Sequence, residues 1–173
     1  SNKDVTSFLS TSPAPYGTLA LKLWVNELGI QTIDESPAAF ELPEETDIVF
    51  IIQPIMDITE SEWKRLDGWV DDGGTLVLAG NGFFSFQGFG HYSFDAVLLD
   101  APAETLSVQT PLLSSPQLAT PIPVKADFGL RSDEADFVTH LAVNNKPVLV
   151  SFDQKRGRVI LSTATYPFSN LGL

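Results

Sequence analysis

The fold is decided by three consecutive stretches, DIVFII (residues 47–52), ITESEWKRLDGWVDD (58–72) and GGTLVLA (73–79). The first is an unbroken apolar run rich in β-branched residues, which predicts a strand covered on both faces. The second predicts a helix, because Thr59 and Glu62 form a capping box at its start. The third predicts another buried strand. Strand, helix and strand at this spacing predict a right-handed βαβ unit with parallel strands.

Upstream of this unit the pattern predicts one helix and two short strands. Thr18 is the expected N-cap, and Gly29 supplies the C-terminal stop. The helix between them is marked by apolar residues at helical spacing, namely Leu19, Ala20, Leu23, Trp24 and Leu28. Residues 4–9 and 30–33 read as the two short strands.

Downstream of Gly80 the pattern changes. Residues 81–92 mix glycine and asparagine with four phenylalanines, which predicts no helix, and prolines then break the chain into short extended pieces. We therefore expect a β-rich insertion at about 83–146, rather than a separate domain. Residues 148–152 and 158–162 predict two strands of a C-terminal antiparallel hairpin. The fold class is α/β, a parallel sheet with helices, carrying this insertion and hairpin.

Composition and net charge limit the number of domains and the classes of partner that the chain can have. The 173 residues include 22 acidic and 10 basic side chains, a formal net charge of −12, with 43% hydrophobic residues and no cysteine. One domain over 3–173 is expected, with Ser1-Asn2 read as a tag remnant and the chain as a piece of a longer protein. The longest apolar run, 48–52, is too short to cross a membrane. The negative charge disfavours nucleic acid and anionic lipid.

The candidate chemistry is weak. Gly80-Asn81-Gly82 follows a strand as a dinucleotide loop would, but Ser85 stands where the third glycine belongs and no helix is predicted there. We read a tight turn and expect no cofactor. His91 and His140 are the only histidines, and no metal site is expected from them. A Ser-His-Asp triad stays open, because its members need not be close in sequence, although no serine stands out as activated.

Two surface patterns have a functional and a structural interpretation. The phenylalanines at 83–89 suit stacking on a sugar or a partner, but such residues more often pin an insertion onto a sheet. The basic segment 155–158 is read as a hairpin tip, too small to bind nucleic acid against the overall charge.

Three motifs occur in order along the chain: residues 15–18 before a helix, residues 73–79, and residues 157–162 closing on 168–170. Together they resemble the DUF4350 family, an uncharacterised bacterial group related to class I glutamine amidotransferase-like and ThuA-like domains. The resemblance implies a flavodoxin-like parallel sheet flanked by helices. It also implies hydrophobic segments outside the domain that hold it on a bacterial membrane, with the domain extracytoplasmic.

The resemblance also bears on catalysis. Class I amidotransferases carry a catalytic cysteine on the turn after a central strand, where this sequence has Asn81, and no cysteine stands elsewhere. Glutamine hydrolysis by that mechanism is therefore excluded. Ligands of open α/β sheets favour the carboxyl ends of the strands. The polar residues expected there are Thr18, Gln53, Asn81, Ser169 and Asn170, with His91 reaching in from the insertion. They line a polar pocket, or they cap helices and satisfy loop backbone.

Two functions remain open. The first is a non-catalytic binding or scaffolding module, a pseudoenzyme at a membrane, that contacts a protein partner through the old active-site edge or the Phe-rich insertion. The second is a hydrolase or carbohydrate-processing enzyme with relocated residues, using His91 with Asp57 or Asp95 near the sheet edge. No nucleic-acid partner is expected for either.

Overall fold

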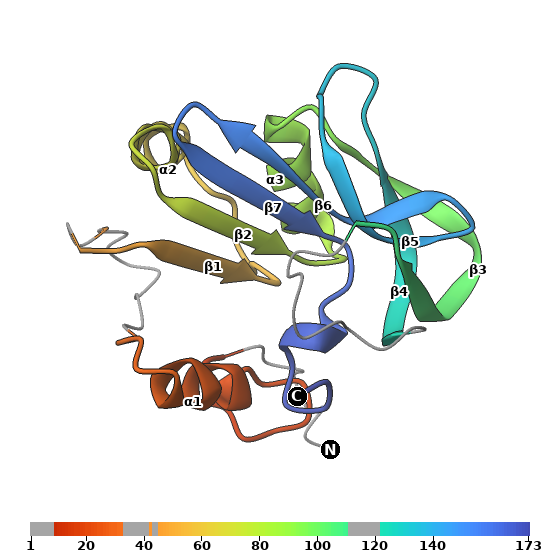
Figure 1. Cartoon of the computed structure of the whole chain (residues 1–173), viewed down its shortest axis with the longest axis horizontal. Helices are drawn as coiled ribbons and strands as arrows, with labels where there is room; N and C mark the ends of the chain where they lie inside the picture. Colours follow the sequence, from red (N-terminus) through yellow and green to blue (C-terminus); the bar gives the residue numbers. More distant parts are fainter. Residues whose placement is uncertain (1–8, 33–41, 43–44, 111–121) are drawn as a thin grey trace. The chain divides into compact units, whose positions relative to one another are not determined.

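The computed structural model describes residues 9–32, 42, 45–110 and 122–173 (Figure 1). By its internal contacts the chain forms two compact units. One spans 1–43 together with 166–173, and the other spans 44–165. Each is described below by itself.

The larger unit is built on a seven-stranded mixed sheet in the order β1-β2-β7-β6-β5-β3-β4. Its strands are β1 (Ile48–Ile52), β2 (Thr75–Ala79), β3 (Asp95–Val108), β4 (Ile122–Arg131), β5 (Val138–Val143), β6 (Lys146–Gln154) and β7 (Gly157–Ser162). β1, β2 and β7 are parallel, and every other pairing is antiparallel. The protein is thus a mixed α/β fold in which the antiparallel strands outnumber the parallel ones.

The βαβ unit predicted from 47–79 is confirmed. Helix α2 (Glu60–Asp71) connects β1 and β2, which pair in parallel from Ile48↔Thr75 to Ile52↔Ala79. Its capping box is formed: the Glu62 carboxylate accepts the Thr59 N–H at 2.7 Å, and Thr59 Oγ1 accepts the Glu62 N–H at 3.4 Å. The predicted C-terminal hairpin is confirmed as well, as β6 paired with β7.

β1 corrects one expectation. Its apolar run predicts a strand covered on both faces, but β1 lies at the end of the sheet order, and Ile48 and Phe50 are 43% and 41% exposed. An apolar run indicates a strand without fixing its place in the sheet. Here β1 pairs with β2 alone among the described strands.

A second correction concerns residues 81–92, where no helix is expected. The structure forms helix α3 (Phe83–His91) there. Glycines lower its intrinsic propensity, but packing overrides propensity. Phe89 is fully buried, and Gly88 lies so close to β2 that a Cβ on it would stand 2.6 Å from Leu78 Cδ2. The expected insertion therefore begins with a helix, and its strands β3, β4 and β5 extend the same sheet.

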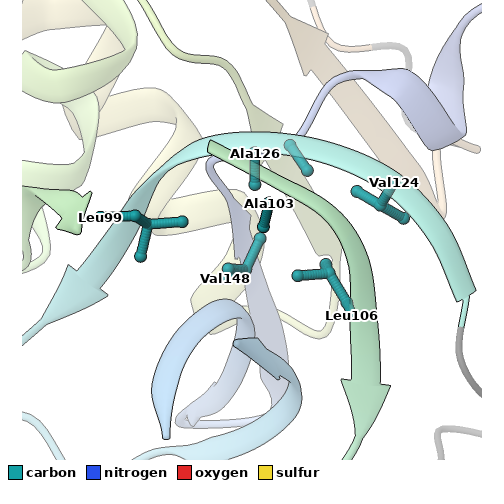
Figure 2. Close-up of a cluster of buried hydrophobic side chains, with 7 residues drawn as sticks. Leu99, Ala103, Leu106, Val124, Ala126 and Val148 are labelled. Carbon is teal, nitrogen blue, oxygen red and sulfur yellow. The ribbon is translucent and has the colours of Figure 1, made fainter. Parts of the chain in front are cut away.

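The antiparallel half has its own hydrophobic cluster (Figure 2). Its buried members are Leu99, Ala103, Leu106, Val124, Ala126, Val148 and Ala164. β3 and β4 curve around this cluster, and their pairing shifts register between Leu98 and Thr105. Such irregularities bend a strand pair, which lets the two long strands enclose the cluster.

The smaller unit contains helix α1 (Leu19–Glu27) and the 3-10 turn η1 (Tyr166–Phe168). Thr18 is the N-cap residue of α1 as predicted, but its side chain makes no capping hydrogen bond. Gly29 ends the helix with a left-handed backbone, φ +83°. Of the two short strands predicted nearby, residues 4–8 and 33 lie outside the described residues, and residues 9 and 30–32 form no strand.

Candidate functional site

The carboxyl ends of β1 and β2 are joined by the side chain of Gln53. This residue directly follows β1, and its N–H donates to the carbonyl of Ala79 at 2.7 Å. Its side-chain Oε1 accepts the N–H of Asn81 at 3.0 Å. Gln53 also has a left-handed backbone, φ +48°, which is uncommon for a residue other than glycine. The structure thus brings together two of the residues predicted to lie at this edge.

The glycines of the Gly80-Asn81-Gly82 turn make room for this arrangement. A Cβ on Gly80 would stand 1.8 Å from Ser85 Oγ and 3.1 Å from Gln53 Oε1, and one on Gly82 would stand 2.8 Å from Gln53 Nε2. The glycine pattern is therefore explained by close approach of side chains to the turn. The sequence predicted no helix after this turn, which counted against a phosphate-binding loop, but the structure forms helix α3 there.

Helix α3 begins at this turn without a side-chain cap. Its N-cap residue is Gly82, and the N–H of Phe86 is bonded to the Gly82 carbonyl at 3.0 Å. Ser85, in the first turn, is fully buried, and its Oγ has no hydrogen-bond partner among the described residues. Buried hydroxyls are normally paired, so this orphan calls for an explanation.

Exposed apolar side chains flank the same turn. Ile55 and Met56, in the loop after β1, are 78% and 50% exposed, and Phe83 at the start of α3 is 69% exposed. Gln53 and Asn81 hold the two loops together. We call these residues (Gln53, Ile55, Met56, Asn81 and Phe83) the carboxyl-edge surface.

His91 lies at the other end of α3. Nine helical residues span about 13 Å, so His91 and the Asn81 turn occupy opposite ends of the helix. His91 Nε2 lies 2.9 Å from Asp67 Oδ2, and its ring stacks on Trp63 with centroids 4.2 Å apart. Its partner is therefore Asp67 on α2 rather than Asp57 or Asp95.

Tyr92 completes the His91 cluster. Its hydroxyl donates to Asp67 Oδ1 at 3.1 Å, so one carboxylate bonds both side chains. Burial raises the pKa of Tyr92 far above its usual range, and the neighbouring negative charge of Asp67 adds to that shift. The phenol is held neutral, as a hydrogen-bond donor that fastens α2 to the end of α3.

Three other predicted site residues belong to the smaller unit. Asn170 Oδ1 accepts the N–H of Ala20 in the first turn of α1 at 2.7 Å, and Asn170 Nδ2 donates to the carbonyls of Ser12 and Ala14. The fully buried Ser169 donates to the Tyr166 carbonyl at 2.8 Å. These bonds cap a helix and satisfy loop backbone, the second of the two roles expected for them. Asn170 supplies the cap that the Thr18 side chain does not.

The other histidine, His140, forms a buried pair that sequence reasoning missed. Its Nδ1 lies 2.8 Å from the Thr110 carbonyl, which can only accept, so Nδ1 donates. Nε2 lies 2.7 Å from the Ser151 hydroxyl oxygen, and when only Nδ1 carries a proton, Nε2 accepts the hydrogen bond from that hydroxyl. Both side chains are almost fully buried, 6% and 5% exposed. The pair joins β5 to β6, and a polar serine in the apolar run of β6 was its one sequence signal.

The basic side chains of residues 155–158 are paired with carboxylates. At the tip of the β6–β7 hairpin, Lys155 bonds Asp71, and Arg156 bonds Asp72 at 2.7 Å. Hydrogen bonds from Lys155 and then from Gln154 hold the pKa of Asp71 below its usual range. The basic tip is thus neutralised by α2. Among the described residues, no group of three or more side chains is arranged to hold a metal ion.

Fold and site together define a mixed α/β domain whose parallel strands end in a glycine turn, an uncapped helix start and exposed apolar side chains. The chain belongs to the DUF4350 family: the family model "Domain of unknown function (DUF4350)" matches residues 10–173. Among curated proteins, none matches the sequence.

The chain is similar to several solved structures, and the mmIFT52 N-terminal domain shares its fold. The mmIFT52 N-terminal domain is 20% identical with a TM-score of 0.62, and the match covers 88% of this chain and 81% of that one. The cytoplasmic protein STM3548 from Salmonella typhimurium is 17% identical over 67% of this chain and 59% of that one, with a TM-score of 0.45. The exo-β-1,4-mannosidase Op5Man5 from an Opitutaceae bacterium is 18% identical with a TM-score of 0.46, and the match covers 70% of this chain and 21% of the mannosidase.

Proposed function

We propose that this domain is a non-catalytic binding or scaffolding module that contacts a protein partner through the carboxyl-edge surface. The observation that carries the proposal is the exposure of Phe83 in one loop and of Ile55 and Met56 in the other, because the Gln53–Asn81 hydrogen bond joins these two loops. Exposed apolar groups of this size gathered on one surface are typical of interaction sites. Aromatic side chains, phenylalanine among them, are enriched at protein interfaces relative to the rest of the surface.

The rest of the Phe-rich segment has a structural role. Phe89 is fully buried, and Phe86 packs edge-to-face on Phe128 with ring centroids 4.9 Å apart. Phe83 is therefore the aromatic side chain of α3 most available to a partner. The interface is centred on the start of the helix, at the edge that would hold the active site of an amidotransferase.

The absence of catalysis rests on residue identity. Asn81 occupies the turn where class I amidotransferases carry their cysteine, and the sequence contains no cysteine. An amide side chain does not form the thioester of that mechanism. We therefore interpret the parallel half as a flavodoxin-like, amidotransferase-like framework that serves binding, that is, as a pseudoenzyme.

The setting is part of the proposal. We place the domain on the extracytoplasmic side of a bacterial membrane, anchored through segments outside this sequence, as the family resemblance implies. No helix in the described part of the chain is long and apolar enough to cross a membrane. The partner would then be a protein at or near that membrane.

The test is crosslinking of the full-length protein in its native membrane, followed by mass spectrometry. Phe83→Ser should remove a reproducible partner. Leu98→Ser is the matched control, because Leu98 is equally exposed, at 70%, but lies on β3. Thermal unfolding of both variants should match the wild type. A partner retained by folded Phe83→Ser and Ile55→Ser variants would contradict the proposal.

A further inference from the structure

We propose that the turn between β2 and α3 is an oxyanion site that takes a carboxylate or phosphate group, and that the side-chain amide of Gln53 occupies it in the free protein. This inference rests on the proposed function, because it gives the carboxyl-edge surface a chemical preference. A ligand suited to it carries an oxyanion next to an apolar group.

The first observation is the orphan hydroxyl of Ser85. It is fully buried and unpaired among the described residues, and its oxygen lies directly against Gly80, 1.8 Å from where a Cβ would stand, on the same side of the turn as Gln53 Oε1, which is 3.1 Å from that point. Burial of an unpaired hydroxyl is unfavourable, because the group loses its hydrogen bonds to water and gains none in exchange. An acceptor that entered the turn would satisfy this hydroxyl.

The second observation is the group that already lies there. Gln53 Oε1 accepts the N–H of Asn81 and stands close to Gly80. An amide oxygen resembles one oxygen of a carboxylate, so the Gln53 side chain marks the position in which a ligand oxygen would be held. Gln53 keeps this position with a left-handed backbone, φ +48°. Displacement of its side chain uncovers the turn.

The third observation is the helix start beneath the turn. The first N–H groups of a helix lack intrahelical acceptors, and the N-terminus carries the positive end of the helix dipole. The cap residue of α3 is Gly82, which has no side chain to offer them. At the start of α2, by contrast, the Glu62 carboxylate fills this role. α3 is thus open to the kind of group that α2 supplies for itself.

The test is an amide NMR titration of the 173-residue chain with acetate and, separately, with inorganic phosphate. The key variant is Gln53→Gly, which removes the amide and suits the left-handed backbone. The Asn81, Phe83 and Phe84 amides should shift saturably, at an anion concentration at least about tenfold below that needed by the wild type. A response to acetate alone identifies a carboxylate site, one to phosphate alone a phosphate site, and one to both the shared chemistry.

Two further variants make the test specific. Ser85→Ala in the Gln53→Gly background should weaken the binding at least about fivefold, because the hydroxyl is lost as a donor. Gln53→Asn repeats the test should Gln53→Gly not fold, since asparagine tolerates a left-handed backbone and is too short to reach Asn81. Amides at the start of α2 should not shift, because Glu62 already occupies that helix start.

The absence of a saturable shift with either anion, in a folded variant that lacks the Gln53 amide, would overturn the inference. An undiminished response in Ser85→Ala would overturn it as well. The titration contains no protein partner and leaves Phe83 intact. If no anion binds but Phe83→Ser still loses the protein partner, the oxyanion site is wrong and the partner surface stands. If an anion binds saturably but Phe83→Ser still captures the partner, the partner surface is wrong and the oxyanion site stands.

Discussion

The parallel and antiparallel halves of the sheet are stabilised in different ways. In the parallel half, β2 is buried along almost its whole length, and helices α2 and α3 follow the strand ends. In the antiparallel half, long strands pair directly and bend around their own cluster, which includes Leu106 and Val124 (Figure 2). The first half combines parallel strand pairing with helices packed on its strands, whereas the second consists mainly of antiparallel strands paired around their own cluster.

This difference explains where the candidate site lies. Helical crossovers place a strand end, a turn and a helix start at one edge, which creates unpaired backbone donors and exposed loops. Residues such as Gln53, Asn81 and Phe83 belong to that edge. In antiparallel hairpins the backbone N–H and C=O groups pair within the sheet. The polar pair of that half, His140 and Ser151, is buried, and the two side chains are hydrogen-bonded to each other.

The largest expected effects come from the cores of the two halves. Leu78→Ala in β2 and Leu106→Ala in β3 should each lower the free energy of unfolding by about 3 kcal/mol, because both side chains are fully buried. Chemical denaturation followed by circular dichroism and by tryptophan fluorescence measures this. Coincident transitions in both variants indicate one cooperative unit. Separate transitions in Leu106→Ala would show that the antiparallel half unfolds on its own.

The buried pair of the antiparallel half gives the next prediction. Ser151→Ala should lower the free energy of unfolding by about 2 kcal/mol, because His140 Nε2 is left without its donor in a buried position. Ser107→Ala is the control: that hydroxyl donates to the Ala142 carbonyl, also on β5, but Ser107 is exposed. Its loss should cost less than about 0.5 kcal/mol. Equal losses in the two variants would show that burial does not set the cost here.

Local sequence signals predicted the parallel half because they act within a few residues. The capping box of α2 and the apolar runs of β1 and β2 need no distant partner. α3 was missed for the opposite reason. Its helix depends on Phe89 and on the close approach of Gly88 to Leu78, neither of which a local pattern contains.

The positions of the candidate site residues were predictable only where they follow from local pattern and topology. Gln53 and Asn81 were found because strand ends meet at one edge of a parallel sheet, a rule that needs only topology. His91 was expected at that edge because 81–92 was read as loop, whereas a helix carries it away. The polar Ser151 in an apolar run and the expected capping role of Asn170 were signals, but the partners of these residues were not predictable. His140 lies on a different strand from Ser151, and Ala20 is 150 residues from Asn170.

The cap of α2 supplies a pH-dependent prediction. Thr59→Ala should lower the free energy of unfolding by about 1 kcal/mol at pH 7. The hydrogen bonds from the Thr59 hydroxyl and N–H hold the pKa of Glu62 below its ordinary value of 4.5. Their stabilisation is therefore complete above that value, and it is lost as the pH falls through the lower pKa of the folded state.

Denaturation of the wild type and Thr59→Ala at pH 7 and pH 3 measures this dependence. The difference between the two proteins should be smaller at pH 3 than at pH 7, because the pH has then fallen below 4.5 toward the lowered pKa of Glu62. Glu62→Gln is the control, because it keeps an acceptor and removes the charge, so its stability should depend less on acid. A difference that stays constant between the two pH values would assign the Thr59 effect to the hydroxyl alone.

The smallest effect distinguishes the two helices directly. Gly68 lies in α2 with no other atom within 4 Å of where a Cβ would stand, so Gly68→Ala should raise the free energy of unfolding by about 0.8 kcal/mol through helix propensity alone. Gly88→Ala in α3 makes the same chemical change against Leu78 and should be destabilising. Opposite signs in chemical denaturation would show that α2 is limited by its own propensity and α3 by its packing on β2. If both variants gain stability, the Leu78 side chain moves to accommodate the added methyl group. The close packing of Gly88 on Leu78 would then not be what limits the stability of α3, and this result would contradict the prediction.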